Sequence, residues 1–221
     1  MIRTTQPEPS ALAIIRASTQ LRPVALVPEI RLHQASEPIG VWERTELAAG
    51  RTNLDPPFWA FAWAGGQALA RHLLDHPEAV KGRRVIDIAS GSGLVAIAAA
   101  RAGAATVTAY DIDPLAAAAI TVNAGANGEA VLPVCADVLD EVPDVDVMLV
   151  ADAFYERDLA ERVMRFLERG HARGADVLAG DFGRAYLPRD RLRALAAYDV
   201  PGLSMLEGSD VKRTTIWTLL A

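Results

Sequence analysis

The sequence predicts an α/β protein with a doubly wound, mostly parallel sheet, an antiparallel strand near the C-terminal end and a small N-terminal extension. Three observations predict this class. A buried strand runs into a glycine-rich turn and a helix over residues 85–101. Strands and helices then alternate regularly along the chain. The last two strand-like runs have no helix between them, and strands joined by so short a link must be antiparallel.

The turn at residues 89–93 is the most informative stretch. Val85 to Ile88 is a short apolar run that contains one carboxylate, Asp87. Gly91 and Gly93 follow, and glycine lets the backbone bend sharply and approach a ligand because it has no Cβ. Leu94 to Arg101 is rich in alanine and prone to form a helix, whose free N–H groups would point back at the turn. This arrangement predicts a nucleotide or nucleoside cofactor.

Two classes of cofactor use such a turn. Residues 91–96 fit G-x-G-x-x-A, the dinucleotide fingerprint, and Asp111 follows Gly91 by about 20 residues, as that motif requires. Asp87 favours another cofactor, because a buried carboxylate would repel a pyrophosphate and attract the amino group of a methionine moiety. We therefore expect S-adenosylmethionine in preference to NAD. The alternative for Asp87 is that it is only a hydrogen-bonded acid within a strand.

The remaining elements follow from hydrophobic periodicity and capping signals. Further strands are predicted at Thr106–Tyr110, Val131–Cys135, Val145–Ala151 and Ala175–Ala179. Helices are predicted from Asp113-Pro114 to about Asn127, at Asp158–Arg169 and at Pro188–Ala197. The two antiparallel strands at the end are expected at Gly202–Glu207 and Thr214–Leu220. With the strand at residues 85–88, the sheet then has seven strands.

Residues 1–54 are predicted to form the N-terminal extension, and residues 55–221 the main domain. The extension should contain a loose tail (Met1–Ser10), a helix (Ala11–Leu21) and two short strands (Val24–Leu32 and Ile39–Glu43).

The aromatic stretch after residue 54 begins Asp55-Pro56-Pro57-Phe58, a motif of methyltransferases that act on amino groups of DNA bases and glutamine. We reject that interpretation, because residues 42–54 are too charged and broken to be a buried strand. The stretch instead leads into a helix at Gly65–Leu74, which places Trp63 and Gly65 beside the cofactor. The alternative for Trp59 and Trp63 is a place in the core.

Composition argues against several classes of partner and site. A net charge of −6 and a pI near 5.2 argue against a nucleic-acid partner. Cys135 is the only cysteine, which excludes an internal disulfide and a cysteine-based metal site and fits a reducing compartment. His72 and His76 lack the glutamate of a zinc helix, so we expect a surface pair and no metal. No apolar run approaches the roughly 20 residues that span a bilayer, so no membrane partner is expected and the cytoplasm is the predicted location.

Six segments together carry a resemblance to a known family: 57–60, 63–69 (Trp-Ala-Gly-Gly-Gln-Ala-Leu), 87–93 (Asp-Ile-Ala-Ser-Gly-Ser-Gly), 111–114 (Asp-Ile-Asp-Pro), 152–155 (Asp-Ala-Phe-Tyr) and 180–184 (Gly-Asp-Phe-Gly-Arg). From about Val24 to the C-terminus the chain resembles the class I (seven-β-strand) methyltransferases, which have a Rossmann-like sheet. More narrowly, it is similar to the protein-lysine methyltransferase family that includes the enzyme modifying the β subunit of electron-transfer flavoprotein. Ala89 replaces a glycine found in many members, and Phe182 stands where close relatives have proline.

The resemblance implies that S-adenosylmethionine is the cofactor, with Asp111 on the ribose hydroxyls and Asp137 near the adenine. The full set of implied cofactor contacts is Trp63, Asp87, Ala89, Gly91, Gly93, Asp111, Ile112, Asp137 and Asp152. It also implies a protein substrate with an exposed lysine, such as the flavoprotein β subunit.

Asp152 and Tyr155 are the candidate catalytic residues, because the carboxyl ends of strands in such a sheet face the ligand crevice. A carboxyl with a reference pKa near 3.9 is a poor base for a lysine with a pKa near 10.4. Asp152 should therefore draw in and orient the lysine, while Tyr155 shapes the channel and makes one hydrogen bond. The alternative is a helix cap and a core tyrosine.

Arg184, Arg189, Arg191 and Arg193 are either a positive face beside the site or solvated helix charges. For the whole chain, the alternatives to lysine methylation are a methyltransferase for a small-molecule amine or an RNA base, a nicotinamide-linked reductase, and a nucleotide-binding module without activity.

Overall fold

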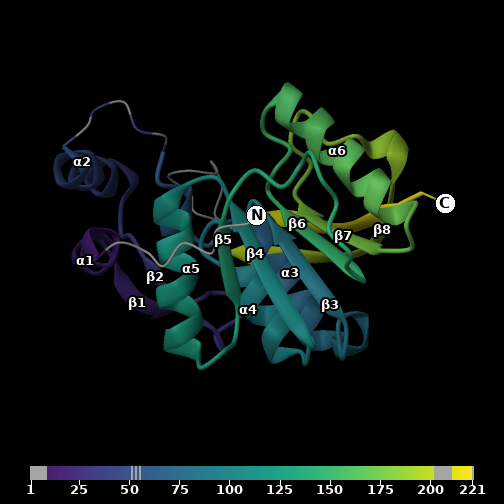
Figure 1. Cartoon of the computed structure of the whole chain (residues 1–221), viewed down its shortest axis with the longest axis horizontal. Coiled ribbons are helices and arrows are strands. Elements are labelled where there is room, and N and C mark those ends of the chain that lie inside the picture. Colours follow the sequence, from purple (N-terminus) through teal and green to yellow (C-terminus); the bar gives the residue numbers. More distant parts are fainter. Residues whose placement is uncertain (1–8, 51, 53, 55, 202–210, 221) are drawn as a thin grey trace.

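The structure is a computed structural model that describes residues 9–50, 52, 54, 56–201 and 211–220. Within them, seven strands form one mixed sheet in the order β5-β4-β3-β6-β7-β9-β8 (Figure 1). The parallel strands are β3 (Arg84–Ile88), β4 (Thr106–Asp111), β5 (Leu132–Cys135), β6 (Val147–Ala151) and β7 (Asp176–Asp181). β9 (Val211–Leu219) runs antiparallel to both β7 and β8 (Leu192–Pro201). The predicted fold class is confirmed.

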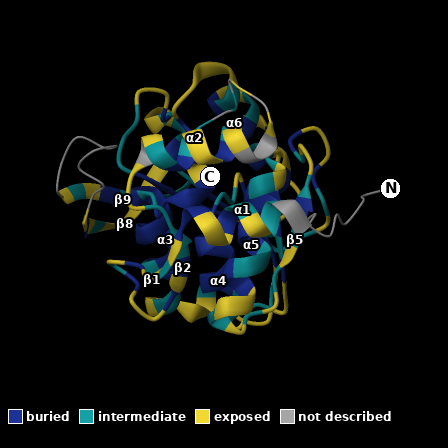
Figure 2. Cartoon of the chain, turned by 90° about the vertical axis from the view of Figure 1, so that its left-hand side faces the viewer, coloured by how far each residue is buried: buried dark blue, intermediate teal, exposed yellow. Residues whose placement is uncertain are grey.

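Helices cover both faces of the sheet. α3 (Ala64–Asp75), α4 (Leu94–Arg101) and α5 (Pro114–Asn127) contribute to one hydrophobic core, and α6 (Arg157–His171) contributes to the other (Figure 1). β6 serves both, because successive side chains of a strand point to opposite faces. Val147 and Leu149 pack toward α3 and α4, whereas Met148 and Val150 pack toward α6. Figure 2 shows the exposed residues gathered on the outer surfaces of the helices and the buried ones inside.

Local signals place several of these elements where we expect them. Asp113 Oδ1 accepts a hydrogen bond from Leu115 N at 2.8 Å, and Pro114 occupies the first turn, so the predicted start of α5 is confirmed. α3 and α6 confirm the predicted helices at residues 65–74 and 158–169 within two residues at each end.

The predicted helix at Pro188–Ala197 is wrong. A 3₁₀ turn at Arg189–Arg191 leads instead into β8, which pairs with β9 from Leu192↔Leu219 to Pro201↔Val211. Alanine and leucine favour a helix by less than about 1 kcal/mol per residue, and pairing along a whole strand outweighs that preference. The antiparallel ending is confirmed for β9, while the strand predicted at 202–207 lies outside the described residues.

The N-terminal segment contains α1 (Pro9–Ser18), β1 (Gln20–Pro23), β2 (Arg31–Gln34) and α2 (Pro38–Ala49). A hairpin is present, but it joins β1 and β2, so the expected strand at 24–32 is misplaced. The expected strand at Ile39–Glu43 is wrong, because Pro38 begins a helix there that runs to Ala49 and is capped by Gly50. The tail predicted at residues 1–10 lies outside the described residues except for Pro9 and Ser10, which begin α1.

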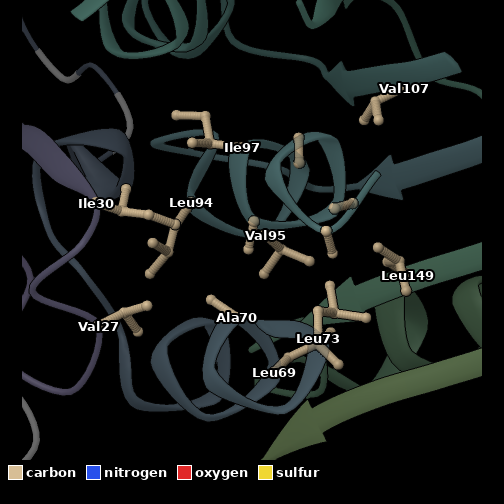
Figure 3. Packing of buried hydrophobic residues seen from close by; sticks show 14 of the residues in the cluster. Val27, Ile30, Leu69, Ala70, Leu73, Leu94, Val95, Ile97, Val107 and Leu149 are labelled. Atoms are coloured by element: carbon tan, nitrogen blue, oxygen red, sulfur yellow. The ribbon is translucent and has the colours of Figure 1, made fainter. Parts of the chain in front are cut away.

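The segment between β1 and β2 packs on the main sheet domain. Val27 and Ile30 are fully buried in the same cluster as Leu69 and Leu94 (Figure 3). α5 holds β2 as well, since Asn123 Oδ1 accepts a hydrogen bond from His33 N at 2.8 Å. The boundary at residues 54 and 55 stays a prediction. In the part of the chain that the structure describes, no helix has the length and apolar character needed to cross a bilayer.

Candidate functional site

A crevice of about 930 Å³ opens where the carboxyl ends of β3, β4 and β6 meet. This volume is within the range of pockets that bind cofactors and drug-sized ligands, about 300–1,000 Å³. The glycine turn, Asp111 and Asp137 line one part of the crevice. Asp152, Tyr155, Phe182 and Arg184 line another. The fold therefore brings most of the predicted cofactor residues and both predicted catalytic residues to a single cavity, although Gly65 and Gly93 do not line it.

The glycine turn has the geometry that the sequence predicts. Gly91 and Gly93 have φ angles of +54° and +82°, in the left-handed region that glycine enters without steric cost. Asp111 ties this turn to the end of β4, because its Oδ2 accepts a hydrogen bond from Gly91 N at 2.8 Å. Its Oδ1 accepts another from Asp113 N at 3.0 Å. A carboxylate has about four lone-pair sites, so Asp111 keeps capacity for ribose hydroxyls.

Asp87 is buried at the base of the crevice. Its Oδ2 accepts hydrogen bonds from the Ser90 hydroxyl and from Ala96 N, the latter at 3.2 Å. Burial raises the pKa of Asp87 to about 7, although both hydrogen bonds oppose the shift. These hydrogen bonds agree with the alternative interpretation, in which Asp87 is a hydrogen-bonded acid within a strand. The Asp87 side chain also lines the crevice. Its contact with a cofactor amino group stays a prediction.

Two residues other than glycine have positive φ angles among the described residues: Ala89 at +52° and Asp152 at +59°. Both line the crevice. Such conformations cost of order 1 kcal/mol or more and concentrate at functional sites. The φ angle of Ala89 is one that glycine would adopt without steric cost.

Asp152 follows β6 directly and joins three elements. Its Oδ1 accepts a hydrogen bond from Gly65 N at 3.1 Å, and its Oδ2 accepts one from Gly66 N at 2.7 Å. Oδ1 also pairs with the Arg184 guanidinium, which contacts Asp181 Oδ2 at 3.2 Å. Burial raises the pKa of Asp152 to about 6, and the Arg184 charge limits that shift. Asp152 thus anchors the first turn of α3 and at the same time faces the crevice.

The anchoring depends on a close contact between two glycines. A Cβ on Gly65 would lie 2.3 Å from the Gly180 carbonyl oxygen and 2.7 Å from Asp152 Cγ. A Cβ on Gly180 would lie 2.3 Å from the Gly65 carbonyl oxygen. Only glycine at both positions lets α3 pack this closely against β7.

Aromatic rings gather at the mouth of the crevice. The Phe58 ring lies 5.9 Å from the Trp63 ring and 5.7 Å from the Tyr155 ring, measured between centroids. Trp63 Nε1 donates a hydrogen bond to the Phe58 carbonyl oxygen at 2.9 Å. The Phe58 and Tyr155 side chains are 41% and 51% exposed. These rings form an apolar surface at the mouth of the crevice.

The residues near the predicted adenine position differ in environment. Ile112 is 71% exposed and lines the crevice, so a flat ligand would cover apolar surface there. Asp137 is partly exposed and pairs with Arg162 at 2.8 Å. Burial alone would raise the pKa of Asp137, but the hydrogen bonds from Arg162 and Leu139 N hold it below its usual value.

The groups that line the crevice fit a nucleoside that carries an amino acid, because Asp111 keeps lone pairs for hydroxyl groups and Asp87 offers a carboxyl to an amine. Trp59 also lines the crevice, but its Nε1 is a donor buried away from the crevice surface, with no acceptor among the described residues. Trp59 is also part of the core, so this residue both lines the crevice and has the place in the core that the sequence offered as an alternative.

For the charged residues, one of two open alternatives is excluded and one prediction is wrong. The arginines at 184, 189, 191 and 193 do not form one positive face, because Arg184 is buried against Asp152 and Asp181 whereas Arg191 pairs with Glu168. His72 is not a surface residue: it is buried, and its Nδ1 lies 3.0 Å from the Tyr198 hydroxyl. In the described ranges, no group of three or more histidine, cysteine or acidic side chains could hold a metal.

Sequence reasoning missed Phe58 and Lys212 as parts of the site, and it missed Asp181 as the second partner of Arg184. Asp181 lies within a motif that carries the family resemblance, and the run of aromatics could have indicated Phe58. No pattern in the sequence singles out Lys212.

Comparison with known proteins now assigns the class. The chain is similar to TrmN from Thermus thermophilus (TM-score 0.52, 25% identity, 81% of this chain and 53% of that one). It is also similar to the magnesium protoporphyrin IX methyltransferase from Synechocystis PCC 6803 with bound S-adenosylhomocysteine (TM-score 0.50, 12% identity, 70% and 82%). The family model of the ribosomal protein L11 methyltransferase (PrmA) matches residues 68–170. Fold, crevice and family model together define a methyltransferase of the class I type.

Two relatives show to which family of methyltransferases the chain belongs. The electron transfer flavoprotein beta subunit lysine methyltransferase of Mus musculus is 35% identical over 219 residues, covering 95% of this chain and 84% of the relative. That of Danio rerio is 37% identical over 201 residues, covering 87% and 76%. The chain belongs to the family of electron transfer flavoprotein beta subunit lysine methyltransferases.

Proposed function

We propose that this enzyme transfers methyl groups from S-adenosylmethionine to a lysine side-chain amine of a protein, with the β subunit of electron transfer flavoprotein as the first candidate substrate. The observation that supports this most is the single crevice, in which the glycine turn and Asp111 lie at one part and Asp152, Tyr155 and the aromatic mouth at another. The names of the relatives supply the candidate substrate.

The cofactor, when bound, supplies an electrophilic methyl group on a sulfonium. The chain's own residues would hold it: the amides around Gly91 and Gly93 at the turn, Asp111 at the ribose, Asp87 at the amino group, and Ile112 and Asp137 near the adenine. Trp63, Ala89 and Asp152 complete the proposed contacts.

The acceptor must lose a proton before it can react. For a lysine with a pKa near 10.4, the neutral form costs about 4.6 kcal/mol at pH 7. Asp152 is too weak a base to remove that proton, and its oxygens already accept two amide hydrogen bonds and the Arg184 ion pair. Its proposed role is to orient the amine, with Tyr155 and Phe58 enclosing the lysine chain. Holding two reactants in line contributes much of the rate in such reactions.

Partner and location follow from the same reasoning. The acidic chain argues against RNA, and we propose a protein partner with no nucleic acid and no membrane. The single cysteine supports a reducing compartment, and we propose the cytoplasm.

The test is incubation with S-adenosylmethionine carrying a labelled methyl group and purified flavoprotein β subunit, followed by mapping of the label by mass spectrometry. The expected result is label on one or more lysines of the β subunit. A parallel incubation with cell extract, resolved on a gel, separates protein acceptors from small molecules and RNA. Label only in small molecules or only in RNA would overturn the proposal.

A further inference from the structure

Lysine is rare in this chain. Among 22 basic residues only two are lysines, Lys81 and Lys212. Lys81 is exposed before the start of β3, at the amino end of that strand and therefore at the opposite edge of the sheet from the crevice. Lys212 is partly buried in β9 and lines the crevice.

Topology explains how Lys212 reaches the site. β9 runs antiparallel to β7 in a register that pairs Thr215 with Asp181, the last residue of β7. Lys212 precedes Thr215 by three residues, so it lies beyond the carboxyl end of β7, beside the turn that contains Phe182 and Arg184. The lysine enters the crevice from the edge at which Asp152 lies.

The Lys212 ammonium rests on an aromatic ring. Its Nζ lies 4.5 Å from the centroid of the Phe182 ring. Arg184 approaches the same ring at 4.3 Å, but its charge is matched by Asp152 and Asp181. Among the residues that the structure describes, no carboxylate lies within ion-pair distance of Lys212. In the part of the chain that the structure describes, the Phe182 ring is therefore the group that attracts this ammonium, and aromatic cages bind lysine and its methylated forms in the same way.

We propose that Lys212 is an acceptor for the enzyme's own reaction, methylated within the chain that carries it while Phe182 holds its side chain at the acceptor side of the crevice. The inference rests on the proposed function. In the step, the ammonium first gives a proton to solvent. The Nζ lone pair then forms a bond to the methyl carbon as the carbon–sulfur bond breaks, and the electron pair of that bond stays on sulfur to give S-adenosylhomocysteine. The flexible four-carbon stem of lysine allows the movement from Phe182 to the methyl group.

The first experiment needs no cofactor. Reductive ¹³C-methylation of the purified chain labels Lys81, Lys212 and the terminal amine, which NMR resolves. We expect the Lys212 methyl signal, identified by its loss in Lys212→Arg, to be shifted upfield from that of Lys81 by the Phe182 ring current. Phe182→Leu, checked for folding by circular dichroism, should return it to the Lys81 position. Coincident lysine signals in the unmodified sequence would overturn the placement on Phe182.

The second experiment measures the modification. The chain is incubated with S-adenosylmethionine alone, and its intact mass and peptides are followed by mass spectrometry. We expect addition of one or more CH₂ units at Lys212, loss of this gain in Lys212→Arg, and an unchanged gain in Lys81→Arg. The fraction modified per minute should not depend on chain concentration, because the acceptor is intramolecular. A rate that rises in proportion to chain concentration, or modification at Lys81, would overturn the inference.

The two proposals can fail separately. An enzyme that methylates the flavoprotein β subunit but leaves Lys212 unmodified overturns only this inference. An enzyme that methylates Lys212 but no lysine of any added protein supports this inference and overturns the proposed substrate.

Discussion

Asp152 Oδ2 lies 2.7 Å from Gly66 N and accepts its hydrogen bond, so a side chain at the end of β6 anchors the first turn of α3. This contact makes the candidate catalytic carboxylate a structural residue as well. The mouth of the crevice and the helix that follows Trp63 therefore depend on one side chain.

Asp152→Asn should abolish methylation while leaving cofactor affinity nearly intact, because eight other proposed contacts hold the cofactor. The amide puts an NH₂ group where one oxygen now accepts hydrogen bonds, so we also expect a loss of about 1–3 kcal/mol in the free energy of unfolding. Methyl transfer, calorimetric titration and urea unfolding measure the three quantities, with the exposed Asp140→Asn as control. Equal losses of activity and cofactor affinity would show that Asp152 is a cofactor or folding residue instead.

Gly65→Ala should destabilise the fold, because its Cβ would lie 2.3 Å from the Gly180 carbonyl oxygen. Overpacking of this kind costs typically 1–3 kcal/mol, read from the urea midpoint. Gly66→Ala is the matched control: the nearest atom to its Cβ would be 3.8 Å away, so stability should stay level or rise by up to about 1 kcal/mol. Similar midpoints for the two variants would contradict the close contact of α3 with β7.

The pH dependence of stability should report Asp87. Its pKa rises from 3.8 to about 7 on folding, so the folded state binds the proton more tightly than the unfolded state does. The unmodified protein should therefore lose stability relative to Asp87→Asn as the pH rises from about 4 through 7, by up to about 4 kcal/mol. Thermal melts at pH 5 and pH 8 measure the difference.

Asp137→Asn should show the opposite pH dependence of stability. The pKa of Asp137 is lowered, so the unmodified protein should gain stability relative to this variant as the pH rises through the acid range. If the stability difference between the unmodified protein and Asp87→Asn did not change with pH, the raised pKa of Asp87 would be contradicted.

Ala89→Gly should stabilise the protein. Ala89 has a φ angle of +52°, and relief of this conformation is worth about 1 kcal/mol. Ala100→Gly, inside α4, should instead lose about 1 kcal/mol, because glycine is a poor helix former. Chemical denaturation of both variants checks the contrast, and a destabilised Ala89→Gly would count against the positive φ.

Asp111→Asn should weaken cofactor binding by about 10–100-fold, the effect of losing a hydrogen bond of 1.5–3 kcal/mol to a charged group. Asp137→Asn should have a smaller effect, because Asp137 is partly exposed and already pairs with Arg162. Calorimetric titration with S-adenosylmethionine measures both constants. An equal loss in the two variants would argue against the ribose role of Asp111.

By itself the sequence determined β3, its glycine turn, α4 and the capped start of α5, since apolar runs, glycines and Asp-Pro caps act over only a few residues. It also placed Asp87 inside a strand near its carboxyl end, with Asp111 and Asp152 at the ends of two other strands, and in a parallel sheet those ends meet at one edge. Only the tertiary structure decided that Leu192–Pro201 is a strand, because β9 supplies the partner that overrides its helix propensity. The tertiary structure also decided that Arg184 pairs with Asp152 and that the Lys212 ammonium lies over the Phe182 ring. Those contacts join residues far apart in the chain, and their attraction depends on distances that no local pattern encodes.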